Sequence, residues 1–263
     1  MHFVDQLGRK INIELYSQLR IISLVPSQTE LLFDLGLDGE VVGITKFCIH
    51  PKEKVVQKEK VGGTKNLNIE KIIALKPTLI IANKEENEKE QIEELAKHFP
   101  VWISDVIDLH SALEMITAVG KMTGREKVAE ELNQKITENF SAPFAPLRLK
   151  KVAYFIWQNP MMVAGNKTFI NDMMQRCGFK NCFQNLKGHY PEISLAQLQQ
   201  ANPEVILLSS EPFPFKEKHI EAFSKICPQA KIMLVDGELF SWYGSRLLHA
   251  PSYFQKLAAS LQP

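Results

Sequence analysis

Short apolar runs alternate with longer amphipathic segments along most of this chain. An uninterrupted apolar run of a few residues is typical of a buried strand, whereas apolar positions three or four apart are typical of a helix. The alternation of the two predicts parallel βα units and therefore an α/β fold. The predicted strands are 20–25, 41–45, 79–82 and 101–104 in the first half of the chain, and 151–157, 205–208 and 232–235 in the second.

Helices are expected between these strands. The first should run from Ser27 to Gly36, with Ser27 as its N-cap and Glu30 completing a capping box. Apolar positions at helical spacing then predict further helices at 86–98, 109–122, 125–140, 168–177 and 251–261.

Two segments repeat one another, since residues 68–82 align without a gap on residues 194–208. Each begins with a residue that favours the N-cap of a helix, Asn68 or Ser194. Each continues as a short amphipathic helix, which ends at a proline because proline lacks the N–H and clashes with the preceding turn. An apolar strand follows. The repeat predicts two lobes of similar construction with a ligand cleft between them.

Two consecutive helical patterns lie between the repeated segments and meet at Gly124, a residue type that favours the end of a helix. We therefore expect an N-terminal α/β lobe at 1–122, a linking helix at 123–146 and a C-terminal α/β lobe at 147–263. A linking helix is stiffer than two or three crossing strands, so a small hinge motion is expected when ligand binds.

The composition is compatible with this plan. A chain of 263 residues suits two domains of roughly 100–150 residues each. The net charge of +1 gives no field that would attract nucleic acid, and no apolar run approaches the roughly 20 residues needed to span a bilayer. The N-terminus lacks the apolar region of a secretory signal, so either the protein stays in the cytoplasm or a signal has been removed from the chain as written. The four cysteines form no CxxC pair, so we expect reduced thiols and no metal or other cofactor.

Residues that follow the predicted strands are candidate ligand contacts, because ligands of open parallel sheets bind beyond the carboxyl ends of the strands. Trp157 ends the first strand of the second lobe, and Trp242, Tyr243 and Arg246 lie in the loop after its last strand. Lys65 lies in a glycine-bearing loop ahead of the first repeat. Aromatic faces beside fixed polar groups suit a large, partly flat ligand. The polar surroundings of Trp242 and Tyr243 predict that their rings are exposed.

Each candidate also has a structural interpretation. Trp157 could cap a hydrophobic core, and Arg246 could form an ion pair with Glu238 or Asp236 in its own loop. His50 is a solitary loop histidine, more often structural or solvated than a ligand, and direct metal binding by it stays open. The chain holds no GxSxG, HExxH or GxGxxG sequence, so a binding protein is favoured over an enzyme.

Four sequence motifs resemble a known family. They are 20–32 (RIISLVPSQTELL), 42–45 (VGIT), 61–64 (VGGT) and 68–77 (NIEKIIALKP). Together they are similar to the helical-backbone, or class III, periplasmic binding proteins of ABC importers, which include cobalamin-, siderophore- and haem-binding members. The resemblance extends from about Arg20 to the end of the chain. It implies two Rossmann-like lobes with parallel sheets, joined by a long backbone helix, with the ligand in the cleft between them.

The same resemblance implies roles for individual residues. Phe47 and Asn83 match aromatic positions at the rim of the ligand cleft, and the loop around Trp242 matches another. Glu70 matches a glutamate with which one lobe docks on the membrane permease. At the corresponding position of the second lobe the chain has Ala196, so the pair of docking glutamates is broken.

Glu192, four residues before Ala196, is the nearest carboxylate that could substitute for the second docking glutamate.

The sequence as a whole predicts a monomeric substrate-binding protein for a cobalamin-like or metal-chelate ligand, such as haem or a ferric siderophore. It would serve an ABC importer, and the resemblance implies a periplasmic location. Two alternatives stay open: a cytoplasmic corrinoid or haem handling protein without a permease, and an enzyme that acts on such a ligand.

Overall fold

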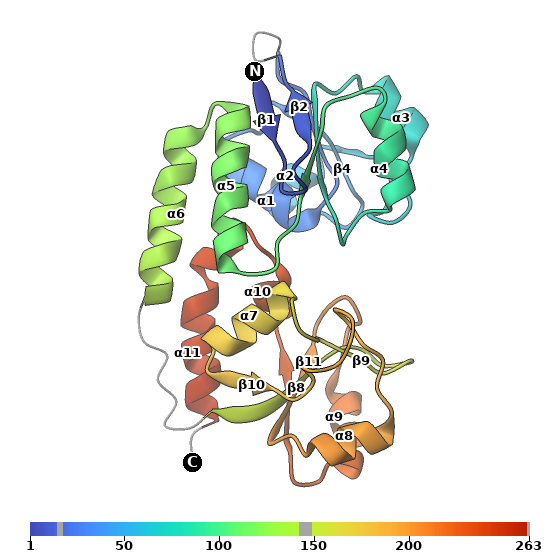
Figure 1. Ribbon diagram of the computed structural model, residues 1–263, viewed down its shortest axis with the longest axis vertical. Helices are drawn as coiled ribbons and strands as arrows, with labels where there is room; N and C mark the ends of the chain where they lie inside the picture. Colours follow the sequence, from blue (N-terminus) through green and yellow to red (C-terminus); the bar gives the residue numbers. More distant parts are fainter. Residues whose placement is uncertain (15–17, 142–148, 262–263) are drawn as a thin grey trace. The chain divides into compact units, whose positions relative to one another are not determined.

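The computed structural model describes residues 1–14, 18–141 and 149–261. This part of the chain divides into two compact units, each built from three segments. Unit 1 comprises Met1–Val106, His110–Glu138 and Tyr243–Arg246, and unit 2 comprises Ile107–Leu109, Asn139–Trp242 and Leu247–Pro263. Each unit contains a mainly parallel sheet with helices beside it, which confirms the predicted α/β class (Figure 1).

The sheet of unit 1 has five parallel strands in the order β5-β4-β3-β6-β7. The strands are β3 (Ile21–Ser23), β4 (Val41–Ile44), β5 (Glu59–Lys60), β6 (Leu79–Asn83) and β7 (Val101–Ser104). The helices are α1 (Pro26–Asp34), α2 (Lys52–Val55), α3 (Ile69–Ala74), α4 (Lys89–Ala96), α5 (Leu109–Thr123) and α6 (Glu126–Ser141). Ile72 of α3 and Leu95 of α4 share one apolar core with the strands, which explains why β3 and β6 are apolar and buried.

The strand order of unit 1 reverses at β3. The chain moves from β3 through β4 to β5 on one side, and then returns to place β6 and β7 on the other side. In open parallel sheets a ligand crevice lies at such a reversal, beyond the carboxyl ends of the two neighbouring strands. The residues that follow β3 and β6 are therefore the candidate ligand contacts of this unit.

Unit 2 has a parallel sheet in the order β10-β8-β11-β12, and its short β9 pairs antiparallel with β8. The strands are β8 (Lys150–Trp157), β9 (Met162–Val163), β10 (Phe179–Asn181), β11 (Val205–Ser209) and β12 (Lys231–Val235). The helices are α7 (Phe169–Arg176), α8 (Leu195–Ala201), α9 (Glu217–Ile226), α10 (Glu238–Ser241) and α11 (Ala250–Ser260). The 3₁₀ helix η1 (Ser245–Leu248) begins in the last segment of unit 1 and ends in unit 2. Here the strand order reverses at β8, so the loops after β8 and β11 are the counterparts of those after β3 and β6.

The sequence repeat corresponds to a structural repeat. The Asn68 side chain caps α3 by accepting from Lys71 N, and Ser194 caps α8 in a capping box with Gln197. The residues before the two prolines also match, since Lys76 and Asn202 have φ values of 47° and 46°. Both helices therefore end in a left-handed residue before the chain enters the next strand.

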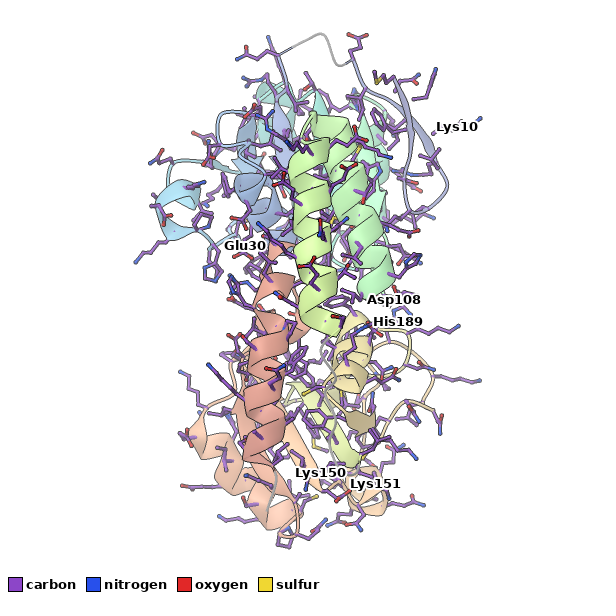
Figure 2. The ribbon with its side chains drawn as sticks, turned by 90° about the vertical axis from the view of Figure 1, so that its left-hand side faces the viewer. Lys10, Glu30, Asp108, Lys150, Lys151 and His189 are labelled. Carbon is purple, nitrogen blue, oxygen red and sulfur yellow. The ribbon has the colours of Figure 1, made fainter. Side chains whose placement is uncertain are left out.

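Helices α5 and α6 run side by side in both views (Figures 1 and 2). Asn133 Nδ2 of α6 donates to Leu113 O and Thr117 Oγ1 of α5, at 2.9 and 2.8 Å. Gly124 between them has a φ of 67°, as expected for a residue that ends a helix. Residues 142–146 of the expected linking segment lie outside the described residues, as do 147–148 and 262–263 of the expected second lobe. The division into lobes and linker stays a prediction.

Two local predictions were wrong or incomplete. The N-cap of α1 is Val25, not Ser27, and no side chain caps this helix. The antiparallel hairpin of β1 (His2–Val4) and β2 (Lys10–Asn12) was not predicted, because each strand has only three residues and one buried or half-buried side chain. After β1 the chain reaches the edge of the main sheet, where Gln6 N donates to Ile103 O of β7.

Candidate functional site

Exposed apolar residues follow β4 in unit 1. Phe47 is 51% exposed and Ile49 is 49% exposed, while Cys48 between them is buried. The ring of Phe47 lies 5.2 Å from Lys46 Nζ and close to Gly63, where a Cβ would come within 3.1 Å of it. Two exposed apolar side chains at a strand end leave a surface that can contact an apolar ligand face. Phe47 is therefore available for the contact that the sequence assigns to it.

Asn83, at the end of β6, is held by its own unit. Its side chain is buried, and Nδ2 donates to Ser104 Oγ at 3.0 Å. Its Oδ1 accepts from the backbone N–H groups of Glu85 and Glu86, at 2.8 and 3.0 Å. These bonds shape the loop after β6, and they use the donor and acceptor atoms that a ligand contact would need. The role of Asn83 in binding stays a prediction without support from its geometry.

Lys65 lies near the same loop. Its Nζ donates to Glu85 O at 2.7 Å and lies 3.3 Å from Glu88 Oε1, while the side chain remains 57% exposed. An exposed ion pair of this kind is weak, about 0–1 kcal/mol, so the ammonium group can exchange partners at little cost. Contact between Lys65 and an anionic or polar ligand group is compatible with this arrangement.

Arg246 forms an ion pair with Glu30, a partner that the sequence did not suggest. Its Nη2 and Nε donate to the two carboxylate oxygens of Glu30 at 2.6 and 3.0 Å, and both side chains are 15% exposed. Glu30 belongs to α1 (Figure 2). Burial raises the pKa of the Glu30 carboxyl, and the hydrogen bond and charge of Arg246 oppose that shift. The pair fastens the segment Tyr243–Arg246 to unit 1 through a bidentate contact.

Trp242 and Tyr243 are buried, with exposed fractions of 6% and 5%, so the expectation that their rings are exposed was wrong. Trp242 Nε1 donates to Glu211 Oε1 at 2.9 Å, which explains why a residue in a polar loop is buried. The polar groups around it are hydrogen-bond partners of the indole and not signs of solvent. Ligand contact by Trp242 and Tyr243 stays a prediction.

Glu211 is a buried carboxylate that sequence reasoning missed. It follows β11, and its Oε1 accepts from Ser241 Oγ as well as from Trp242. Burial is the largest cause that raises the pKa of this carboxyl, and the nearby charges of Glu238 and Asp236 raise it further. No motif surrounds Glu211, and only its position just after a strand could have drawn attention to it.

Trp157, at the end of β8, belongs to an aromatic cluster that is partly exposed. Its ring packs edge-on against Phe213 at 5.5 Å, and Phe213 in turn contacts Phe215 and His219. The side chain of Trp157 is 38% exposed, while Phe215 is 5% exposed and reaches the core of unit 2. The cluster therefore has a buried base and an exposed indole, which agrees in part with each interpretation of Trp157.

Glu70 is exposed in the first turn of α3. An open depression of about 540 Å³ lies beside it, lined by Gly62, Asn66, Leu67, Asn68, Ile69 and Glu70. At the equivalent place on α8, Ala196 is exposed and its neighbour Leu195 is 52% exposed. The two helices thus present surfaces of different chemistry, acidic on α3 and uncharged on the first turn of α8.

No group of three or more His, Cys, Asp or Glu side chains that could hold a metal ion occurs in the described ranges. The four cysteines are free thiols. His50 lies near enough to Glu30 for its charge to lower the pKa of that carboxyl, although burial outweighs this effect. Among residues 1–14, 18–141 and 149–261, no helix combines the length and apolar composition that crossing a membrane requires.

Comparison with known proteins gives consistent results. The vitamin B12-binding protein of Vibrio campbellii is 29% identical over 198 residues, which cover 72% of this chain and 70% of that protein. The vitamin B12-binding protein of Pectobacterium atrosepticum is 26% identical over 255 residues, which cover 92% and 89% of the two chains.

Solved structures share the fold. The periplasmic vitamin B12-binding protein BtuF of Vibrio cholerae has a TM-score of 0.77 at 23% identity, covering 92% of this chain and 98% of that one. The molybdate-binding protein MolA of Haemophilus influenzae has a TM-score of 0.81 at 15% identity, covering 99% and 91%. A family model described as periplasmic binding protein matches residues 21–225. Because that model spans most of the chain and the fold agrees with it, the chain belongs to the periplasmic binding protein family.

Proposed function

We propose that this protein is the substrate-binding component of an ABC importer and that its ligand is a corrinoid. The vitamin B12-binding proteins of several bacteria, 24–29% identical to this chain, carry the proposal. Two exposed aromatic residues, Phe47 after β4 and Trp157 at the end of β8, support it because a corrin offers large apolar faces. The protein acts by binding and not by catalysis.

The remaining candidate residues take secondary roles in this proposal. Lys65 meets polar groups at the edge of the ligand, while Trp242, Tyr243 and Arg246 support the binding surface through their buried contacts. Asn83 holds the loop after β6. Glu70 docks on the permease, and the protein works as a monomer in the periplasm.

Ligand titration tests the proposal. The purified protein is titrated separately with cyanocobalamin, haemin and a ferric hydroxamate siderophore, with calorimetry and absorbance as readouts. We expect saturable binding of cyanocobalamin at one site per chain, and binding of the other two at least about tenfold weaker. If only haemin or only the siderophore binds, the ligand is that class of metal chelate and not a corrinoid. If none of the three probes binds, the proposal is rejected.

The uncharged surface at Ala196 favours one alternative, a corrinoid handling protein that has no permease. Glu70→Ala distinguishes the two functions. For an importer component, this variant should bind cyanocobalamin normally and fail to support transport into cells or vesicles that contain the permease. Unchanged transport, or the absence of any transport by the wild-type protein, would favour the handling protein.

A further inference from the structure

The Ser104 hydroxyl group fixes the orientation of a neighbouring glutamine. Ser104 Oγ donates to Ala82 O at 3.1 Å and accepts from Asn83 Nδ2 at 3.0 Å and from Gln28 Nε2. A hydroxyl group has one hydrogen to donate and two lone pairs, so all of its hydrogen-bonding capacity is used. Gln28 must therefore turn its NH₂ group toward Ser104, and its Oε1 must face elsewhere.

The Gln28 Oε1 atom has no donor. Gln28 is 1% exposed, and Oε1 is buried without a hydrogen-bond partner in the described part of the chain. A buried acceptor of this kind costs free energy, and in native proteins it usually marks a site for water or for a ligand group. Gln28 also lies in the first turn of α1, directly after β3, where the strand order of unit 1 reverses.

The first turn of α1 supplies donors at the same place. The N–H groups of Ser27 and Gln28 have no acceptor within the helix, because they belong to its first turn. No side chain caps this helix, and no carboxylate lies in its first turn. The helix dipole adds partial positive charge there, which favours an oxygen acceptor.

A separate segment of the chain brings a third polar group. Gly244 packs on the first turn of α1, since a Cβ at Gly244 would lie 2.8 Å from Ser27 O. The next residue, Ser245, is 4% exposed, and its Oγ has no hydrogen-bond partner among the described residues. Two unpartnered buried polar atoms thus belong to elements that touch at the start of α1.

From these observations we propose that the start of α1, with Gln28 and Ser245, binds a peripheral carboxamide of the ligand and discriminates against a carboxylate. A carboxamide oxygen can accept from the N–H groups of Ser27 and Gln28, while its NH₂ group donates to Gln28 Oε1. Ser245 Oγ can serve as donor or acceptor. This inference rests on the proposed function and narrows the ligand to chelates whose edge carries primary amides.

The donor and acceptor pattern sets the selectivity. A carboxylate offers acceptors only, so it would leave Gln28 Oε1 without a donor and would place negative charge against that oxygen. Corrinoids with an intact periphery carry carboxamides, whereas haem carries carboxylates. The site therefore favours an amidated corrinoid over haem and over a corrinoid whose amides are hydrolysed.

The test compares two corrinoids that differ in these groups. Dicyanocobinamide carries peripheral carboxamides, and dicyanocobyrinic acid carries carboxylates in their place. Both are titrated into the wild-type protein, Gln28→Met and Ser245→Ala, with the exposed Gln57→Met as a matched control. Melting temperatures are measured for all four proteins without ligand.

We expect the wild type and Gln57→Met to bind dicyanocobinamide at least about tenfold more tightly than the acid. Gln28→Met should lose about tenfold in affinity for dicyanocobinamide and little for the acid, so the ratio between the two falls. Ser245→Ala should weaken dicyanocobinamide binding without lowering the melting temperature, because it removes an unpaired buried hydroxyl.

Two results would overturn the inference. One is an unchanged affinity ratio in Gln28→Met; the other is normal affinity in Ser245→Ala together with a lower melting temperature, which would indicate a structural water site only. Cyanocobalamin binding by the wild type in either case would leave the proposed function intact. Failure of the wild type to bind any corrinoid would reject both.

Discussion

The contact between Trp242 and Glu211 leads to a quantitative prediction about stability. Trp242→Phe removes the indole N–H that donates to Glu211 Oε1 at 2.9 Å and keeps an aromatic ring at a position that is 6% exposed. A hydrogen bond to a charged group contributes about 1.5–3 kcal/mol, and the smaller ring adds a packing loss of about 1 kcal/mol. We expect the free energy of unfolding to fall by about 2.5–4 kcal/mol.

A double-mutant cycle isolates the hydrogen bond from the packing loss. Glu211→Gln keeps an Oε1 acceptor and removes the charge, so Trp242→Phe should cost less in that background, by about 1 kcal/mol or more. The four proteins are unfolded with urea at pH 7 and followed by circular dichroism. If the two substitutions are additive within about 0.5 kcal/mol, the indole does not stabilise the Glu211 carboxylate and the reasoning is refuted.

The pH dependence gives the sign of the Glu211 charge effect. Burial raises the pKa of this carboxyl above its ordinary value of 4.5. At pH values between the ordinary and the raised pKa, the folded protein therefore retains a proton on Glu211 that the unfolded chain has lost. The stabilisation by the protonated form is complete below about pH 4.5 and is lost as the pH rises through the raised pKa. Glu211→Gln should remove this decline and should be more stable than the wild type near neutral pH.

Three further predictions concern single side chains. Phe47→Ala should weaken cyanocobalamin binding by about 1–3 kcal/mol in calorimetry and leave the melting temperature nearly unchanged, because the ring is half exposed; a large drop in melting temperature would make Phe47 structural. Arg246→Lys should lower the free energy of unfolding by about 1–2 kcal/mol, since lysine cannot make the bidentate contact with Glu30, and unchanged urea unfolding would contradict this. Gly237→Ala should lower the free energy of unfolding by about 2 kcal/mol or more in the same assay, because the added Cβ would lie 2.7 Å from Glu211 Cγ. Wild-type stability of this variant would mean that the loop moves to make room for the methyl group.

The sequence predicted the elements whose signal is local. Asn68 and Ser194 cap their helices as expected, because an N-cap depends on a side chain and a backbone N–H three residues later. The buried parallel strands were likewise predictable, since burial on both faces makes most of their residues apolar. Ser27 failed as an N-cap because the helix already begins at Pro26, so the N-cap is Val25, two residues earlier.

The candidate site was harder to predict, because its contacts join residues that are far apart in the chain. Trp242 looked exposed in its polar loop, and only the fold reveals that Glu211 accepts its N–H. Arg246 was predicted to contact ligand, with an ion pair inside its own loop as the alternative, and neither suggested its bidentate contact with Glu30. No sequence pattern pointed to Gln28. Its Oε1 is unpaired because Ser104, on a strand far along the chain, can only accept a hydrogen bond from the Gln28 NH₂ group.

Unit 1 is built from segments that are far apart in the chain, and this affects how the protein folds during translation. Glu30 and Arg246 are 216 residues apart, and at 5–20 residues per second the ribosome needs roughly 10–40 s to pass from one to the other. During that interval the Glu30 carboxylate has no guanidinium partner, and the first turn of α1 lacks the segment that packs on it. Contacts of such long sequence separation form late and slowly. The N-terminal half of a nascent chain should therefore remain incompletely folded until translation is almost finished.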